Sequence, residues 1–485
     1  MMNVPRVSLK PDTTASADRT RRWLAVILAL VVASGFSRTA VAQPVAAGDL
    51  DPRIVKLVQS VSSERLMAIL KKLESFGTRS TLSSPDKPDR GIGAARQWIF
   101  DELKSYGPRL QVSFDTYQVA KQGRIARDVD VRNVMAVLPG RNPRRIYISG
   151  HYDTVARAGG QSTANASGPT FHDPDAAAPP PADPTAPLDN LAPGVNDDGS
   201  GTSIAIELAR VFSQSGIEFD ATLVFMCHVA EEQGLLGAKL HAEKAVREKI
   251  RIDAVLNNDI VGNETGGSGI VDGASIRVYS EGPEDSPSRE LARFVQRWGS
   301  RYVPSHKIRL MARPDRFGRG GDHSGYNQFG FAAVGFRESR ENFTRQHDVR
   351  DTSEGISIAY LTQNARVNAA SAATLALAPP APVVTGDRGQ PQIGRQPTGY
   401  DANLRWTASA GAVAYRIFWR EAWGPDWQHD LVVANVTQVV LPNMQIDDYV
   451  FGIAALDAQG HESLVSPYVS TPRPGTPVKT VQSGG

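Results

Sequence analysis

Apolar and polar positions follow two alternating patterns through the first three quarters of the chain. One pattern has helical spacing, as in residues 92–106, where Gly107 ends the repeat, and in residues 203–212. The other consists of short, nearly continuous apolar runs, which occur at residues 146–150, 222–230, 254–259 and 331–336. Runs that are apolar at every position predict strands buried on both faces. Strands that alternate with helices therefore predict an α/β domain with a largely parallel central sheet.

A different pattern begins after an apolar, proline-rich linker, which we assign to residues 379–388. Residues 389–474 show period-two alternation, with Tyr415, Ile417 and Trp419 on one face of a predicted strand. Turn residues separate the strands, and a region of this size and pattern predicts a small all-β sandwich. It carries no visible chemistry, so we expect a spacer or binding role with an unknown partner. Residues 475–485 are expected to form a disordered tail.

Residues 43–378, which precede the linker, are expected to form the catalytic domain. Within them, one segment lacks the pattern of a folded element. Residues 159–193 are rich in proline and alanine and have no periodic apolar positions. Such a composition cannot build a packed core. We therefore expect a long surface loop inserted between two site motifs.

The N-terminus has the features of an export signal. Arg19, Arg21 and Arg22 precede a short apolar run, and an A-x-A cleavage site ends at Ala42. The alternative is a membrane anchor, but the run is short for a bilayer. We therefore expect residues 1–42 to be a signal peptide and the protein to be periplasmic or extracellular. No later stretch has the length and apolar character of a membrane span, so we expect none after signal removal.

Composition excludes several other classes of function. The 485 residues are 41% hydrophobic and 21% charged, as in soluble globular proteins, and the length predicts two or three domains. A formal net charge of +2 gives no indication of a nucleic-acid partner. The single cysteine, Cys227, cannot form an internal disulfide and lies in an apolar run, so it is interpreted as a buried structural thiol.

Five short segments place acids or histidines at the ends of predicted strands, where open α/β sheets form ligand sites. A histidine can bind a metal through one ring nitrogen while a nearby acid, as in the pair His151 and Asp153, accepts the other ring N–H. Adjacent glutamates at a buried strand end, such as Glu231 and Glu232, need compensation for their charge, which a metal supplies. The remaining candidates are Asp197 and Asp198 in a glycine-rich turn, Asp259, and His347 with Asp351.

Two histidines and three carboxylates suit zinc, with one shared carboxylate holding two ions about 3.5–4 Å apart. Cobalt or manganese could replace zinc at such ligands. Any one of these segments alone is more often a surface or capping feature. The five together, each at a strand end, favour a metal centre.

In order, the segments GHYDT, PGVNDDGSG, AEEQGLLGA, NND and GDHSGYNQFGFAAVGF…QHDVRDT resemble the motifs of the twenty-eighth metallopeptidase family. That family includes bacterial aminopeptidases, glutamate carboxypeptidase II and glutaminyl cyclases. The resemblance covers about residues 50–375. It implies a phosphorylase-like, zinc-exopeptidase α/β fold, with helices on both faces of a mixed sheet. The C-terminal pattern similarly resembles a fibronectin type III domain, through Trp406, the YRIFWR strand and Tyr449, which the resemblance places in a tyrosine corner.

The resemblance also implies a role for each matching residue. One zinc would be held by His151, Asp197 and Asp259, and the other by Asp197, Glu232 and His347. Glu231 would be the general base, and Asp153 would orient His151. In relatives, the segment that contains Asp322 and Tyr326 lines the substrate pocket, whereas His323 is given a structural role here.

The function that these features favour is a secreted, two-zinc aminopeptidase that hydrolyses peptides. The zinc pair would lower the pKa of a water, and Glu231 would take its proton as it attacks the scissile carbonyl. Gln346 stands where several relatives carry a tyrosine that assists the oxyanion. A glutaminyl cyclase, a carboxypeptidase or dipeptidase, and a binding protein with a vestigial site are the alternatives. For the carboxypeptidase, candidate arginines that could bind a substrate carboxylate are Arg316, Arg319 and Arg337.

Overall fold

The computed structural model describes residues 50–155 and 190–469. The predicted export signal at 1–42, the predicted tail at 475–485 and most of the predicted inserted loop lie outside these residues. Within the described ranges, no helix is both long and apolar enough to cross a membrane.

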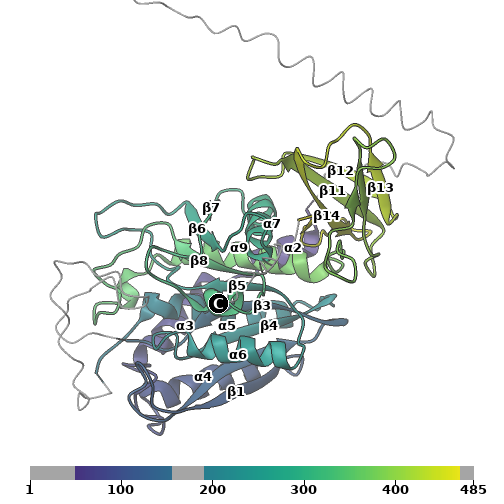
Figure 1. Ribbon diagram of the computed structural model, residues 1–485. Coiled ribbons are helices and arrows are strands. Elements are labelled where there is room, and N and C mark those ends of the chain that lie inside the picture. The colour runs from purple at the N-terminus through teal and green to yellow at the C-terminus, as the bar shows by residue number, and fades with distance from the viewer. Residues whose placement is uncertain (1–49, 156–189, 470–485) are drawn as a thin grey trace, which may run out of the picture. The chain divides into compact units, whose positions relative to one another are not determined.

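A mixed sheet of eight strands forms the centre of the catalytic part (Figure 1). In space the strands follow the order β1-β2-β4-β3-β5-β8-β6-β7. The central run β4-β3-β5-β8 is parallel throughout, whereas β1, β2 and β6 pair antiparallel with neighbours. The strands are β1 (Gln111–Val119), β2 (Val129–Leu138), β3 (Asn142–His151), β4 (Ala221–His228), β5 (Ile252–Asn258), β6 (Ser275–Ser280), β7 (Lys307–Met311) and β8 (Ala333–Glu338). The predicted α/β class is confirmed.

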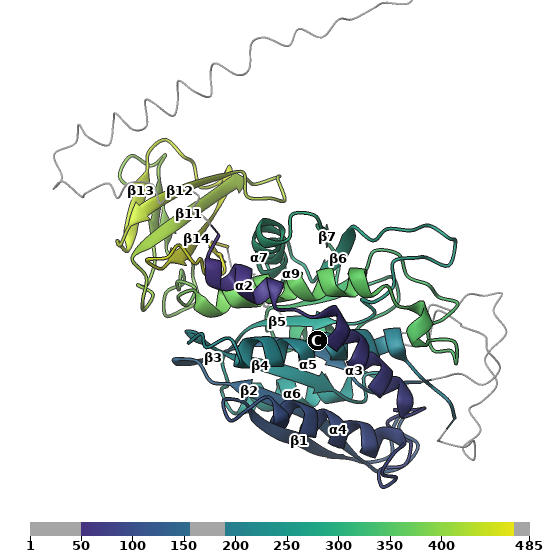
Figure 2. The ribbon, with the colours of Figure 1, turned by 180° about the vertical axis from the view of Figure 1, so that it is seen from behind.

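Helices cover both faces of this sheet. In Figure 1, α6 lies in front of the sheet, and in Figure 2 the helices α2 and α3 lie on the side towards the viewer. The helices are α2 (Pro52–Gln59), α3 (Ser63–Ser75), α4 (Gly91–Ser105), α5 (Ser200–Ser213), α6 (Leu236–Arg247), α7 (Pro287–Tyr302), α8 (Asp322–Asn327) and α9 (Ile358–Leu377). The helical patterns predicted at 92–106 and 203–212 correspond to α4 and α5.

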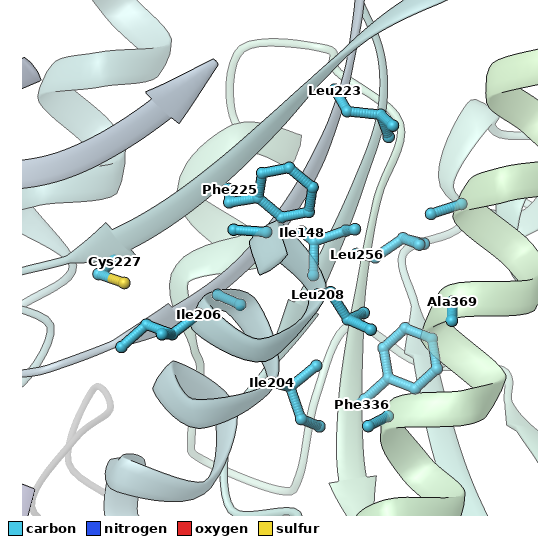
Figure 3. Packing of buried hydrophobic residues seen from close by; sticks show 14 of the residues in the cluster. Ile148, Ile204, Ile206, Leu208, Leu223, Phe225, Cys227, Leu256, Phe336 and Ala369 are labelled. Carbon is cyan, nitrogen blue, oxygen red and sulfur yellow. The ribbon is translucent and has the colours of Figure 1, made fainter. Parts of the chain in front are cut away.

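Alternate side chains of each central strand enter two different cores, which explains the uninterrupted apolar runs. On β3, Ile146 and Ile148 pack in the core that contains Leu208 of α5, and Tyr147 packs in the second core with Ala238 of α6. Figure 3 shows Ile148, Phe225 and Leu256 from three neighbouring strands gathered around α5, with Ala369 of α9 nearby. A sheet buried on both faces is a rigid platform for groups placed at its edge.

The region after the linker is all-β, as predicted. It has two antiparallel sheets, of orders β13-β10-β9 and β12-β11-β14-β15. The strands are β9 (Ile393–Gly394), β10 (Ala402–Arg405), β11 (Ala414–Glu421), β12 (His429–Ala434), β13 (Gln438–Leu441), β14 (Tyr449–Leu456) and β15 (Ser466–Pro467). Tyr415 and Ile417 are buried in their core, next to Trp406. Tyr449 packs on this core through its ring, whereas it is the Tyr468 hydroxyl that donates to a backbone carbonyl, that of Arg405, at 2.8 Å.

The Phe225 side chain tests the packing of the central sheet. Replacing it by alanine should lower the free energy of unfolding by about 3–5 kcal/mol, because a fully buried ring is lost and a cavity remains. The control is Val246→Ala on α6, where the residue is 51% exposed and a change within about 0.5 kcal/mol is expected. Denaturant unfolding followed by far-UV circular dichroism measures both. Equal effects of the two substitutions would contradict this packing.

Candidate metal centre

Four neighbouring parallel strands deliver the predicted metal ligands to one edge of the sheet. His151 is the last residue of β3, and Glu231 and Glu232 follow β4 after a short turn. Asp259 directly follows β5, and His347 lies in the loop after β8. Because the carboxyl ends of parallel strands meet at the same edge, these side chains converge.

A tight turn before α5 brings in the remaining acids. Asp197 and Asp198 lie in the turn Val195–Gly199, and the peptide bond between them is cis. This turn packs closely because α5 begins against the strand ends. At Gly201 a β-carbon would collide with the backbone carbonyl of Asn258. Glycine there lets the helix approach, as the glycine-rich motif led us to expect.

The Asp197 carboxylate lies between the two histidines. Its Oδ1 is 3.4 Å from His151 Nε2, and its Oδ2 is 3.1 Å from His347 Nε2. His151 Nε2 is also 3.8 Å from Asp259 Oδ1, and His347 Nε2 is 3.0 Å from Glu232 Oε1. Ligand atoms bound to one tetrahedral zinc lie about 3.3 Å apart, given bonds of about 2.0–2.1 Å. Asp197, Glu232 and His347 thus form one three-residue group whose ligand atoms lie within 4.8 Å of one another, and the other oxygen of Asp197 lies beside His151.

Asp198 has a different role from its neighbour. It also lies close to His151 and Asp259, and the three offer ligand atoms within 4.8 Å of one another. However, its Oδ2 accepts the His151 backbone N–H at 2.9 Å, and its Oδ1 accepts those of Gly201 and Ile260 at 2.9 and 3.2 Å. Asp198 therefore holds the backbone of the site, whereas the Asp197 carboxylate faces the two histidines.

The cluster is buried and rich in acidic side chains. The five ligand side chains are at most 9% exposed. Burial opposes the charged form of His151, but the Glu231 carboxylate and other nearby acids raise its pKa well above the usual value. Burial likewise opposes protonation of His347, but Glu232 and Asp197 raise its pKa to about 10. Without metal, the acids therefore hold protons on both imidazoles, and metal ions would replace those protons.

Two buried atoms of the site lack a well-aligned hydrogen bond to the described residues. They are His151 Nε2 and Glu232 Oε1, which lie in ion-pair contact with Asp197 and His347 at 3.4 and 3.0 Å. A buried polar atom that lacks such a bond is costly, and coordination to a cation removes that cost. Two imidazoles and three carboxylates in two groups are a donor set that zinc accepts. The residues present therefore fit a zinc centre.

Glu231 lies next to the proposed ligands but farther from the His151 Nε2 atom than Asp197 and Asp259 do. Its Oε2 lies 3.9 Å from His151 Nε2. Burial raises the pKa of Glu231 well above the usual value, and the negative charge of Asp259 adds to this effect. A buried carboxylate next to the metal ligands, with a raised pKa, is suited to accept and return a proton.

Asp153 supports both His151 and the two glutamates. His151 Nδ1 is 3.1 Å from the Asp153 backbone carbonyl and 3.5 Å from its Oδ1. The two Asp153 carboxylate oxygens accept the backbone N–H groups of Glu231 and Glu232 at 3.2 and 3.3 Å, and the Thr81 hydroxyl donates at 3.2 Å. Asp153 thus orients the turn that carries the base as well as the imidazole.

Three residues at the site have a left-handed backbone that side-chain-bearing residues seldom adopt. They are Ala230, Ile260 and His347, with φ of 60°, 59° and 54°. Ala230 directly precedes Glu231, and Ile260 directly follows Asp259. Strain of this kind persists where the surrounding packing fixes the backbone, and it occurs often at functional sites.

The two predicted pocket residues have different surroundings. Asp322 begins α8 with both carboxylate oxygens buried and without a hydrogen-bond partner within the described ranges. Burial raises its pKa to about 8. Tyr326 is fully buried in the core on the α6 face, with its hydroxyl 3.3 Å from His228 Nε2, so it lies in the core and not on a substrate-facing surface. His323 Nε2 lies 2.8 Å from the Pro314 carbonyl, which agrees with a structural role.

The three arginine candidates are engaged by acids of the chain itself. Arg316 pairs with Asp315 and Glu341, and Arg319 pairs with Glu341. Arg337, from β8, forms ion pairs with Asp259 and Asp315. The Gln346 amide also donates to Glu341, at 3.1 Å. These side chains form a wall beside the centre in which each guanidinium already has a carboxylate.

Two further residues support the site: Arg79, which the sequence analysis missed, and Asp351, which it named as a candidate without a stated role. Arg79 is fully buried and lies in a segment to which the sequence analysis assigned no functional residue. Asp351 accepts the backbone N–H groups of Asn196 and Asp197, both at 2.9 Å. An arginine in the weakly patterned sequence FGTRST gave no signal, because its partners are backbone groups far along the chain.

The sequence is similar to that of known proteins over most of its length. Residues 133–372 match the family model of Peptidase family M28. A probable zinc metalloprotease of Pyricularia oryzae is 34% identical over 83% of this chain and 82% of its own length. One of Pyrenophora tritici-repentis is 32% identical over 85% of this chain and 86% of its own.

Solved structures show a similar fold. LapB from Legionella pneumophila has a TM-score of 0.51 at 18% identity and covers 75% of this chain and 83% of its own. The LapA aminopeptidase of the same organism has a TM-score of 0.50 at 18% identity, covering 68% and 78%. Together with the zinc-type ligand set, the extended sequence similarity shows that this chain belongs to peptidase family M28 and is a zinc metallopeptidase.

Proposed function

We propose that the protein is an exported aminopeptidase that works with two zinc ions. The observation that carries this proposal is the position of Asp197, with one oxygen towards His151 and the other towards His347. A single shared carboxylate between two buried ligand groups is the arrangement that a pair of ions requires. The intact set of ligands and the base Glu231 support an enzyme over a vestigial binding site.

The mechanism follows from the residues around this carboxylate. His151, Asp197 and Asp259 would hold one ion, and Asp197, Glu232 and His347 the other. When bound, zinc supplies the Lewis acidity that acidifies a water and polarises the scissile carbonyl. Glu231 takes the proton of the attacking water and passes it to the leaving amine. Asp153 keeps Glu231 in place through the backbone N–H that it accepts.

The charges beside the centre support trimming from the N-terminus. Asp322 is fully buried, and burial raises its pKa to about 8, so it presents no exposed charge to a substrate and does not bear on this choice. Arg316, Arg319 and Arg337 are paired internally and are less suited to a substrate carboxylate. This distribution favours an aminopeptidase over a carboxypeptidase.

Export is proposed from the sequence features of residues 1–42. The basic residues, the short apolar run and the A-x-A site ending at Ala42 form a signal-peptide pattern. An exported peptidase would act on peptides outside the cytoplasm. Sequencing the N-terminus of protein collected from the periplasm or medium, with Gln43 expected first, tests this proposal.

Two measurements together test the proposed function: the zinc content of the protein and the substrates that it hydrolyses. We expect about two zinc ions per chain by elemental analysis and release of N-terminal residues from aminoacyl anilides and peptides. Blocking the substrate amine should abolish this release. One zinc with pyroglutamate formation from glutaminyl peptides would indicate a cyclase. Hydrolysis that needs a free C-terminal carboxylate would indicate a carboxypeptidase.

The base assignment predicts the effect of Glu231→Gln. Turnover should fall about a thousandfold or more, because proton transfer is lost while all five ligands remain. Zinc content should stay at the wild-type level. The matched control is Glu243→Gln on the exposed side of α6, which should keep full activity. Initial rates and elemental analysis of the same samples measure both, and substantial activity in Glu231→Gln would rule out this base.

The shared carboxylate predicts unequal metal loss from two conservative variants. Asp197→Asn should weaken both sites, because each uses one oxygen of this carboxylate. Glu232→Gln should weaken only the site that contains His347. After dialysis against a weak chelator we expect well under one zinc per chain in the first variant and about one in the second. Equal retention in both variants would contradict the bridging role.

A further inference from the structure

Arg79 is a fully buried arginine whose side chain pairs with no carboxylate among the described residues. Its guanidinium instead donates to four backbone carbonyls. Nε reaches the carbonyl of Tyr152 at 2.7 Å, and Nη2 reaches that of Gly194 at 2.7 Å. Nη1 reaches those of Pro193 and Leu73 at 2.5 and 3.2 Å. A planar guanidinium with five donors in a fixed fork can satisfy such a set, and a lysine cannot.

The four carbonyls belong to three separate parts of the chain. Leu73 lies in α3, and Tyr152 directly follows the ligand His151. Pro193 and Gly194 directly precede the turn Val195–Gly199, which carries Asp197. The two ligand-bearing segments are separated in sequence by residues 156–189, which are outside the described residues. Arg79 therefore connects the backbone next to one histidine ligand with the backbone next to the shared carboxylate.

Backbone contacts around Arg79 extend the same connection. Its N–H donates to the Thr154 hydroxyl at 2.9 Å, and that hydroxyl donates to the Ala192 carbonyl at 2.9 Å. Thr78 and Ala192 form a parallel β-bridge. Two residues beyond Arg79, the Thr81 hydroxyl donates to Asp153 at 3.2 Å. The segment from residue 78 to residue 81 thus contacts both ligand-bearing segments.

The charge of Arg79 acts on the acids of the centre. Asp351, Asp198, Asp153 and Asp197 all interact electrostatically with its guanidinium. Burial lowers the pKa of Arg79 to about 10, so the side chain remains charged at neutral pH. A fixed cation behind the carboxylates offsets part of their mutual repulsion while leaving their ligand oxygens free, because its own donors are directed to carbonyls.

We propose that Arg79 is the positioning residue that assembles the metal centre before metal binds, by fixing the segment after His151 against the segment before Asp197. The inference rests on the metal centre proposed above. Neighbours that orient metal ligands typically change metal affinity about ten- to a hundredfold when replaced. We expect an effect of this size on zinc affinity when Arg79 is replaced by lysine. Lysine keeps the positive charge but lacks the planar guanidinium that reaches four carbonyls.

Arg144 provides a matched control. It is also buried, also donates to a backbone carbonyl, that of Ala378, and pairs with Asp220 and Asp253 at 3.0 and 3.2 Å. It lies near the first residue of β3, at the opposite end of the strand from His151. Arg144→Lys should therefore lower stability without reaching the metal centre.

The experiment compares the purified full chain with its Arg79→Lys and Arg144→Lys variants. Zinc affinity is measured by competition with a chromophoric chelator, the visible spectrum is recorded with cobalt, and the melting temperature is determined on metal-free protein. We expect Arg79→Lys to lose about ten- to a hundredfold in zinc affinity and to change the cobalt spectrum. Arg144→Lys should keep both within about twofold, with a comparable loss of melting temperature.

A native zinc affinity and cobalt spectrum in Arg79→Lys would overturn the inference, whatever its melting temperature. Absence of zinc from the wild-type chain would instead overturn the proposed metal centre. If Arg79→Lys does not fold, Arg79→Gln replaces it, since an amide keeps two donors for the backbone carbonyls and loses the five-donor guanidinium. A severalfold loss of zinc affinity in that variant supports the inference, and an unchanged affinity contradicts it.

Discussion

The concentration of buried negative charge at one edge of the sheet is the constraint on which the rest of this structure depends. Asp197, Glu231, Glu232, Asp259 and Asp322 share a small volume from which water is largely excluded. Such a group of carboxylates is unstable unless cations neutralise it. In the absence of metal, raised imidazole pKa values supply part of that charge. Zinc ions would replace the imidazole protons, and the same carboxylates would then hold a catalytic centre.

The parallel strands bring the charges together, and a buried polar network keeps them in place. Asp153, Asp198 and Asp351 accept backbone N–H groups of the residues that carry or adjoin the ligands. Arg79 performs the complementary task by donating to carbonyls of the same segments. Together these residues satisfy the backbone of loops that are buried and, at three positions, strained. The ligand geometry is therefore a property of the loops' hydrogen bonds as much as of the ligands themselves.

Much of the fold and the ligand set could be predicted because both leave local signals. The apolar run at 222–230 contains β4, which ends at His228, just before the paired glutamates. The β-sandwich was likewise evident from period-two alternation around Tyr415. The burial of Tyr326 was not predictable, because the motif GDHSGY is mostly polar and gives no local sign that the tyrosine ring packs in the core. The pairing of Arg337 with Asp259 depends on strands that are distant in sequence.

The sequence by itself determined which residue types end each strand, and hence that two histidines and several acids meet at one edge. That follows because strand periodicity is local and parallel strands share a direction. Only the tertiary structure decided which carboxylate oxygen faces which histidine. It also decided that Asp198 accepts backbone N–H groups while Asp197 faces the two histidines. The contacts of Arg79 with both ligand-bearing segments are likewise visible only in the structure. These arrangements depend on contacts between segments far apart in the chain, whose relative positions are set by packing and hydrogen bonding and not by any local pattern.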